Sequence, residues 1–290
     1  MTTSKLIAGP DPNPVKPSVK FPAGACDAHC HVFGPGDVFP YHPNRSYTPP
    51  DAPKEKLKAL HDHLGIDRAV IVHASCHGTY MDATLDAIAS SSGKYRGTSI
   101  VASSITDDAL RRLHEGGIRA VRFNFVKHLE SVPEPEDVRR MADRVNEMGW
   151  HLVVHLDAVD ITELTPLLLS LPVPFVIDHM ARVKASEGLD QLPFLTLLAL
   201  IQHESAWVKI CGGERVSSSD PTFHDAIPFA QALIAVAPDR VLWGTDWPHP
   251  NVRIMPNDGD LVNLFGEYTS DPAVQKQILV DNPDRLYFYE

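Results

Sequence analysis

The chain has 290 residues, and its 26 Lys and Arg against 37 Asp and Glu give a formal net charge of −11 at pH 7. Hydrophobic residues make up 43% and charged residues 22%, as in an ordinary soluble protein. An acidic chain without a cluster of Lys and Arg argues against nucleic acid or an anionic membrane as partner. No apolar run reaches the roughly 18 residues of a membrane span, and Cys26, Cys30, Cys76 and Cys211 form no C-x-x-C pair. We therefore expect reduced thiols and a cytoplasmic location.

The first 21 residues differ in composition from the rest of the chain. They are rich in proline and contain no apolar core of a secretory signal, so we expect an extended N-terminal arm. No linker or internal repeat follows. The expected organisation is an arm over residues 1–21 and a single domain over residues 22–290.

Within this domain, short runs rich in Val, Ile, Ala and Phe alternate with helical stretches. The expected strands are residues 25–33, 68–75, 96–102, 118–125, 151–156, 175–180, 206–211 and 241–247. The expected helices are residues 54–64, 81–91, 107–115, 134–148, 161–170, 192–203 and 222–236, with a last segment over 260–279. This alternation predicts the α/β class and a single (β/α)8 TIM barrel. The rival doubly wound sheet is disfavoured because no G-x-G-x-x-G follows the first strand.

Polar residues with metal-ligating side chains stand at the ends of several expected strands. His29 and His31 end the first strand, His155 the fifth, His179 the sixth and Asp246 the eighth. Each alone has an ordinary explanation, such as a hydrogen-bonded histidine or an aspartate that caps a helix. Because barrel active sites form at these strand ends, their joint occurrence instead indicates a site. Imidazole and carboxylate groups suit a divalent ion such as Zn²⁺.

Several longer segments carry a resemblance to a known family. They are residues 22–35 with Asp-x-His-x-His, residues 74–78, 122–125 and 176–180, and residues 243–251 with Gly-Thr-Asp-Trp-Pro-His. These segments resemble the amidohydrolase superfamily, and within it the lactonase group of 2-pyrone-4,6-dicarboxylate hydrolase. The resemblance extends from residue 22 to residue 287 and implies an enzyme that hydrolyses a carboxylic ester bond in a lactone.

The resemblance also implies roles for individual residues. Asp246 would be the general base that acts on water, and His179, with His29 and His31, would surround the lactone carbonyl. The residues expected to bind the anionic substrate are Tyr47, Ser75, His77, Arg122, His128, Arg182 and Arg215.

Two positions depart from the pyrone hydrolase pattern. His128 stands where that pattern has a second arginine, and His155 stands where it has a tyrosine. His155 makes the set His29, His31, His155 and Asp246 similar to the superfamily members that hold one metal ion, so one Zn²⁺ per chain is expected. The lost arginine argues against a second carboxylate subsite.

Both departures favour hydrolysis of 4-sulfomuconolactone to maleylacetate and sulfite, in aromatic-compound degradation. The alternatives are hydrolysis of 2-pyrone-4,6-dicarboxylate, and a sugar-acid lactone isomerase or a metal-dependent decarboxylase of the same superfamily. Each alternative uses the same set of residues at the strand ends.

Overall fold

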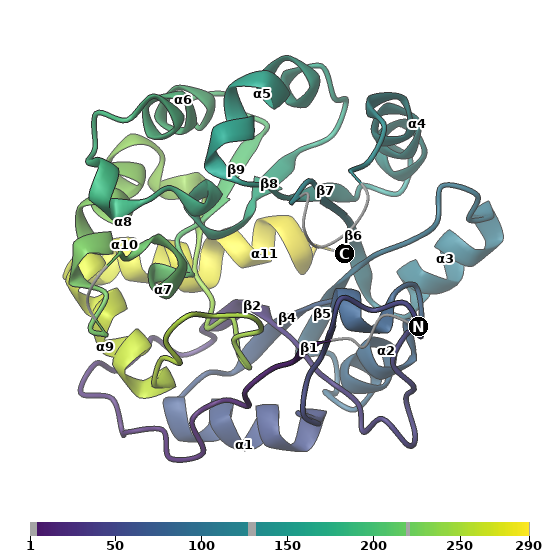
Figure 1. The fold of residues 1–290 in the computed structure, drawn as a ribbon, viewed down its shortest axis with the longest axis horizontal. Coiled ribbons are helices and arrows are strands. Elements are labelled where there is room, and N and C mark those ends of the chain that lie inside the picture. The colour runs from purple at the N-terminus through teal and green to yellow at the C-terminus, as the bar shows by residue number, and fades with distance from the viewer. Residues whose placement is uncertain (1–4, 127–131, 219–220, 290) are drawn as a thin grey trace.

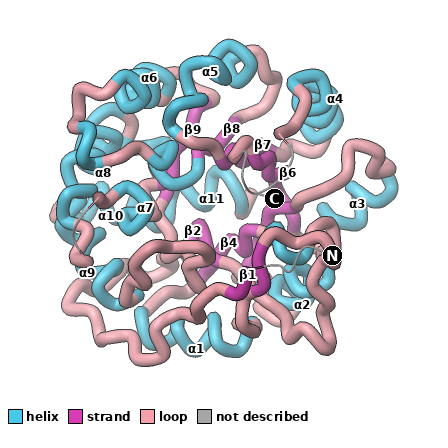
Figure 2. Tube along the Cα trace, viewed as in Figure 1, coloured by secondary structure: helices cyan, strands magenta, loops and turns pink. Residues whose placement is uncertain are grey.

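The computed structural model describes residues 5–126, 132–218 and 221–289. Eight parallel strands lie in chain order in one curved sheet: β2 (Cys26–Cys30), β4 (Arg68–Val72), β5 (Tyr95–Ser99), β6 (Ile118–Asn124), β7 (His151–His155), β8 (Phe175–Ile177), β9 (Ala206–Lys209) and β10 (Val241–Leu242). Backbone hydrogen bonds from Ala28 to Trp243 and from Asp246 to His29 join the last strand to the first. The predicted (β/α)8 barrel is confirmed (Figures 1 and 2).

Helices separate the strands and form a ring around them (Figure 1). They are α1 (Lys54–Leu64), α2 (Asp82–Ala89), α3 (Asp107–Glu115), α4 (Pro135–Asn146), α5 (Ile161–Leu169), α6 (Leu192–Leu200), α7 (Gly213–Val216), α8 (Ile227–Val236), α9 (Asp258–Tyr268), α10 (Pro272–Lys276) and α11 (Asn282–Tyr287). The bounds of α1 and α3 are the predicted ones. The last predicted segment, 260–279, is divided among α9, α10 and a π-helical turn, and α11 follows it.

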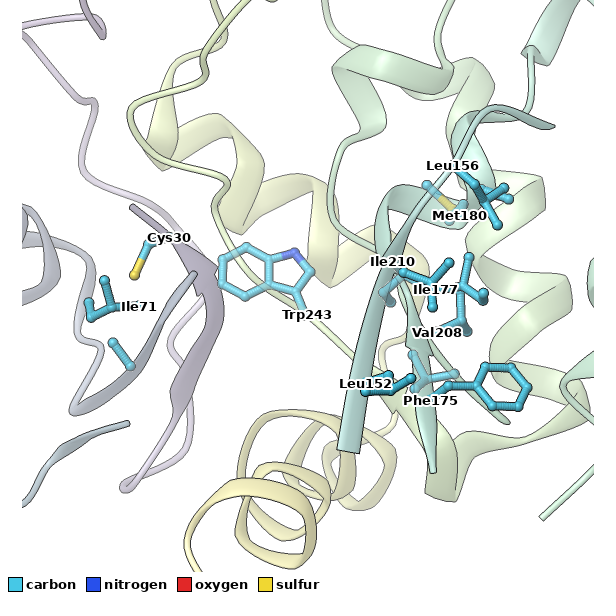
Figure 3. Packing of buried hydrophobic residues seen from close by; sticks show 14 of the residues in the cluster. Cys30, Ile71, Leu152, Leu156, Phe175, Ile177, Met180, Val208, Ile210 and Trp243 are labelled. Carbon is cyan, nitrogen blue, oxygen red and sulfur yellow. The ribbon is translucent and has the colours of Figure 1, made fainter. Parts of the chain in front are cut away.

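The alternation of side chains along each strand separates two apolar layers. Phe175 and Ile177 of β8 belong to the layer between the strands and the helices, where Figure 3 shows them near Val208 of β9. Val176, between them in sequence, belongs to a second cluster inside the barrel. Strands buried on both faces explain why the sequence showed continuous apolar runs.

Helix α11 closes the end of the barrel where the strands begin. Leu286 and Tyr287 pack among interior residues such as Cys26 and Leu242, and the ring of Tyr287 lies 4.6 Å from the ring of His151 at the start of β7. Figure 1 shows α11 across the middle of the ring of strands. In the described part of the chain, the opposite end of the barrel, which carries the expected site, is therefore the entrance for a ligand.

All eight strands end earlier than predicted, and two of them give way to a turn that carries a site residue. Strand β8 ends at Ile177, and the next residues, from His179 to Arg182, have φ values between 51° and 56°. Strand β10 ends at Leu242, and Asp246 has φ of 64°. The left-handed region is unfavourable for residues other than glycine, so both turns depend on the surrounding packing.

The described part of the N-terminal arm contacts the barrel domain. Strand β1 (Lys5–Leu6) pairs with β3 (Tyr47–Thr48), which precedes α1. We propose that residues 1–21 form an extended arm that is separate from the barrel domain of residues 22–290. None of the helices in the described ranges has the length and apolar character needed to cross a membrane.

Candidate active site

A cavity that is partly open to solvent lies at the carboxyl ends of the strands. The residues that line it are His31, Tyr47, Ala74, Ser75, Arg122, Asn124, His155, His179, Arg182, Arg215, Asp246, Pro250 and Asn251. Most of the polar groups in this list come from strand ends, as the barrel architecture predicts.

Asp246 is the residue on which the site converges. Its Oδ1 lies 3.2 Å from Nε2 of His31, 3.5 Å from Nε2 of His29 and 3.8 Å from Nε2 of His179. Its Oδ2 accepts hydrogen bonds from Nε and Nη2 of Arg215, the first at 2.8 Å. One carboxylate oxygen thus faces three imidazoles, while the other faces a guanidinium.

The hydrogen bonds of His31 decide what it presents to Asp246. Its Nδ1 lies 2.7 Å from the carbonyl oxygen of Val72, so this nitrogen is the donor. With its hydrogen on Nδ1, an uncharged ring presents a lone pair on Nε2 to the carboxylate oxygen 3.2 Å away. Two acceptors at this distance repel unless a proton or a cation lies between them. The His31–Asp246 pair is therefore suited to hold a positive charge.

His29 has two possible partners for its other nitrogen. Nδ1 lies 3.1 Å from Nζ of Lys209 and 3.3 Å from Oδ1 of Asp178, and Lys209 and Asp178 are themselves 3.2 Å apart. All three side chains are fully buried. Nε2 of His29 has no hydrogen-bond partner within the described ranges and is directed at Asp246. It is a buried polar atom available to a ligand.

Burial and charge perturb the pKa values of these groups. Burial lowers the pKa of His29 to about 4, with a further lowering by Lys209. Burial also holds the pKa of His179 well below its ordinary value. The pKa of Asp246 lies well below its usual range because Arg215 and the neighbouring histidines outweigh burial, which opposes them. Near neutral pH the site therefore combines neutral His29 and His179 with an ionised Asp246.

The turn after β8 places His179 and Arg182 in the cavity together. Four consecutive left-handed residues, 179–182, form this turn, at an intrinsic cost on the order of 1–2 kcal/mol each. Met180 and Ala181 are fully buried, and Nη1 of Arg182 lies 3.3 Å from Oδ1 of Asp157. Packing and this ion pair thus hold a strained segment that carries two pocket residues, which is common at functional sites.

Each arginine of the pocket already has a carboxylate partner. Nε of Arg122 donates to Oδ2 of Asp178 at 3.0 Å, Arg182 pairs with Asp157, and Arg215 pairs with Asp246. The positive potential at the mouth is therefore smaller than three free arginines would produce. A guanidinium has five N–H donors, so each arginine retains donors for an anionic substrate.

Among the described residues, most of the predicted site residues come together, and His155 and His77 lie apart from the central group. His155 lines the cavity, but its ring nitrogens do not complete the group formed by His29, His31 and Asp246, whose ligand atoms lie within 4.8 Å of one another. Its ring instead lies edge-on to His179, 5.7 Å between centroids. The geometry thus favours a three-residue group of His29, His31 and Asp246, and His155 as a fourth ligand stays a prediction.

His77 also lies apart from the expected substrate-binding residues. His77 is buried outside the cavity lining, with Nδ1 3.2 Å from the carbonyl oxygen of Pro40 and Nε2 accepting from the backbone N–H of Gly34. These contacts fix the loop before α1 and leave the ring no free nitrogen for a substrate. His128 lies outside the described residues. Tyr47 and Ser75 line the cavity as expected.

The sequence interpretation did not assign several residues that the structure brings to the site. Asn124 at the end of β6 and Asn251 after β10 line the cavity, and Lys209 and Asp178 contact Nδ1 of His29. The sequence does distinguish Lys209, since it is a lysine that ends a run of buried strand residues. Its partner, His29, comes from another strand, and the sequence alone does not indicate this contact.

A family model described as amidohydrolase matches residues 26–289. A 2-pyrone-4,6-dicarboxylate hydrolase from Comamonas testosteroni is 46% identical over 288 residues, covering 96% of this chain and 94% of that protein. A 4-sulfomuconolactone hydrolase from Rhizobium radiobacter is 40% identical over 283 residues, covering 96% and 95% respectively.

Solved structures have the same fold. One from Pseudomonas putida, named as a candidate 2-pyrone-4,6-dicarboxylic acid hydrolase, superposes with a TM-score of 0.81 at 29% identity and covers 93% of this chain and 99% of its own. An amidohydrolase from Burkholderia multivorans with bound zinc shares the fold, with a TM-score of 0.70 at 15% identity, and covers 92% of this chain and all of its own, 100%.

Proposed function

The chain belongs to the amidohydrolase family and is a lactone hydrolase, and we propose that it opens a small anionic lactone with Asp246 as general base and His179 as a donor to the carbonyl oxygen. The observation that carries the proposal is the convergence of three imidazoles on one oxygen of Asp246, at 3.2 to 3.8 Å, inside a cavity lined by three arginines. It joins a proton acceptor, hydrogen-bond donors and anion-binding groups in one place.

Members of this family commonly use a metal, and the donor set here fits a single divalent ion. Tetrahedral zinc with bonds of about 2.0–2.1 Å separates its ligand atoms by roughly 3.4 Å. The distances from Asp246 Oδ1 to Nε2 of His31 and His29, 3.2 and 3.5 Å, match that edge. We propose one Zn²⁺ held by His29, His31 and Asp246, with Asp178 accepting from Nδ1 of His29 as a supporting partner. Such an ion lowers the pKa of a water it binds toward about 7.

Each side chain then has its own role in the reaction. Asp246 accepts a proton from the attacking water and returns it to the ring oxygen when the ester bond breaks. Nε2 of His179 donates to the carbonyl oxygen as negative charge develops there. The remaining N–H groups of Arg122, Arg182 and Arg215 bind the anionic substituents, and the amides of Asn124 and Asn251 are available to orient them.

4-Sulfomuconolactone is the substrate that we favour, with maleylacetate and sulfite as products. Support comes from the two departures from the pyrone hydrolase pattern. His155 replaces a tyrosine and lines the cavity, and His128 replaces an arginine that would bind a second carboxylate. A relative named for this activity is 40% identical along nearly the full chain.

Hydrolysis of 2-pyrone-4,6-dicarboxylate is the second candidate, since a relative with that name is 46% identical. Comparing kcat/KM for the sulfonated lactone, the pyrone dicarboxylate and a neutral five-membered lactone separates the two. We expect the first to be best and the neutral lactone poor. If the pyrone dicarboxylate is the best substrate, the second candidate replaces the first.

Isomerase and decarboxylase chemistry are tested in ¹⁸O-labelled water. A hydrolase places the label in a new carboxylate, whereas an isomerase or a decarboxylase does not. We propose that the enzyme acts in the cytoplasm on a small molecule, without nucleic acid or membrane as partner.

A further inference from the structure

We propose that Cys211 sets the tautomer of His179: the thiol donates to Nδ1, so that Nε2 carries the hydrogen that faces the substrate carbonyl. Cys211 would then be a positioning residue, acting through the histidine without touching the substrate. The inference deepens the proposed function and rests on it for the catalytic consequence, whereas the tautomer itself is measurable without any substrate.

The contact between the two side chains is direct and closed to solvent. Sγ of Cys211 lies 3.4 Å from Nδ1 of His179, and both residues are 2% exposed. Cys211 follows β9, two residues beyond Lys209. Because alternate strand residues share a face, the same edge that brings Lys209 to His29 brings Cys211 to His179.

The backbone of Gly212 lies close to the ring of His179, next to this thiol. A Cβ at Gly212 would lie 2.8 Å from Nδ1 and 3.0 Å from Cβ of His179, closer than atoms can pack. Gly212 also has φ of 81°, which disfavours any side chain. A side chain at position 212 would therefore collide with the ring on the side of Nδ1. Among the described residues, Cys211 provides the hydrogen-bond partner that Nδ1 has.

The direction of the hydrogen bond follows from the chemistry of the two atoms. An imidazole lone pair is a good acceptor, whereas a thiol sulfur is a weak one, so S–H donation to Nδ1 is the better arrangement. Burial raises the pKa of the Cys211 thiol well above its ordinary value, so the proton to be donated is present.

The charge on the other side of the ring agrees with this direction. Nε2 lies 3.8 Å from Oδ1 of the ionised Asp246, which favours a hydrogen on Nε2 over a lone pair. The opposite tautomer would set a lone pair against the carboxylate and leave the thiol hydrogen unused.

The assigned tautomer separates two histidines that stand beside the same oxygen. His31 has its hydrogen on Nδ1, bonded to Val72, and offers a lone pair to a cation. His179 has its hydrogen on Nε2, so it cannot ligate through that atom and donates to the substrate instead. The partner of each Nδ1, a backbone carbonyl or a thiol, thus distinguishes a metal ligand from an oxyanion donor.

The first experiment measures the tautomer in the free enzyme. The protein is labelled with ¹⁵N-histidine, and long-range ¹H–¹⁵N correlation spectra are recorded at pH 7.5, with the signals of His179 assigned by their loss in His179→Gln. We expect Nδ1 to show the shift of an unprotonated nitrogen and Nε2 that of an N–H. A protonated Nδ1 in the wild-type enzyme would overturn the proposal.

The second experiment tests whether the thiol is the cause. In Cys211→Ala, we expect part of the His179 population to move its hydrogen to Nδ1 and kcat to fall by about tenfold with little change in KM, since loss of a whole oxyanion donor costs about 10²–10³. Cys211→Ser keeps an O–H donor and should restore both the tautomer and kcat to within a few-fold.

Cys26→Ala is the matched control, because Cys26 is also a buried thiol but packs inside the barrel away from the cavity. It should change neither readout. If Cys211→Ala retains the wild-type tautomer, Cys211 does not set it. If the tautomer behaves as expected but no lactone is hydrolysed, the proposed function fails while the assignment of the hydrogen stands.

Discussion

Arg215 and Asp246 form an asymmetric pair in which Nε and Nη2 of the guanidinium both donate to Oδ2 of the carboxylate, Nε at 2.8 Å. The pair leaves Oδ1 to the three histidines. It also holds the pKa of Asp246 well below its usual range. A carboxylate of low pKa is a weak base toward ordinary water. This agrees with the position of the other oxygen of Asp246, Oδ1, beside a site suited to a cation.

Replacing Asp246 by asparagine tests its role as base. The amide has the size of the carboxylate but cannot accept a proton, so kcat should fall by about 10²–10⁴, and more where metal binding is also weakened. Steady-state kinetics with the best lactone gives the number. Asp239→Asn, at a partly exposed residue paired with Arg240, should retain full activity. Near-normal turnover in Asp246→Asn with full metal content would exclude Asp246 as base.

Metal content distinguishes the three-ligand site from the four-ligand site. His31→Gln should reduce bound zinc to background in elemental analysis, because it removes the lone pair aimed at Asp246. His155→Gln should keep about one ion per chain, since its ring is turned toward His179. Equal loss in both variants would restore His155 to the ligand set.

Lys209 should weaken metal binding at this site. Its ammonium lies 3.1 Å from Nδ1 of His29, where it repels a cation and competes for the nitrogen that must carry a hydrogen when Nε2 ligates. Lys209→Met should bind zinc about tenfold more tightly in a calorimetric titration, by the loss of Coulomb repulsion. Lys184→Met, at an exposed lysine, should not differ from wild type. Weaker binding in Lys209→Met would mean that the ammonium supports the site.

Acid should destabilise the fold, in part through His151. Burial inside the barrel lowers the pKa of His151 from 6.5 to about 3. The unfolded chain therefore takes up this proton near pH 6.5 while the folded chain resists it. The stability that this group contributes is present above pH 6.5 and is lost as the pH falls toward 3, at about 1.4 kcal/mol for each pH unit.

Urea denaturation between pH 7 and pH 4.5 measures that slope. His151→Leu should reduce it by the equivalent of one proton. His203→Leu, at an exposed histidine, should leave it unchanged. An unaltered slope in His151→Leu would show that His151 is protonated in the folded state.

The sequence by itself determined the barrel, because a strand buried on both faces requires an apolar run and an outer helix requires its own period. It also placed His29, His31, His179 and Asp246 at one end of the barrel, since parallel strands set all their carboxyl ends on one side. These rules act along the chain, so they apply whichever side chains of different strands come into contact.

Only the tertiary structure decided how those residues face one another. The strained turn at residues 179–182, the pairing of Lys209 with His29 and the contact of Cys211 with His179 join residues from different strands. Which ring nitrogen holds a hydrogen depends on these neighbours. Hydrogen bonds and charges act over a few ångströms in space, so a linear pattern specifies which side chains approach the site but not which of their atoms meet.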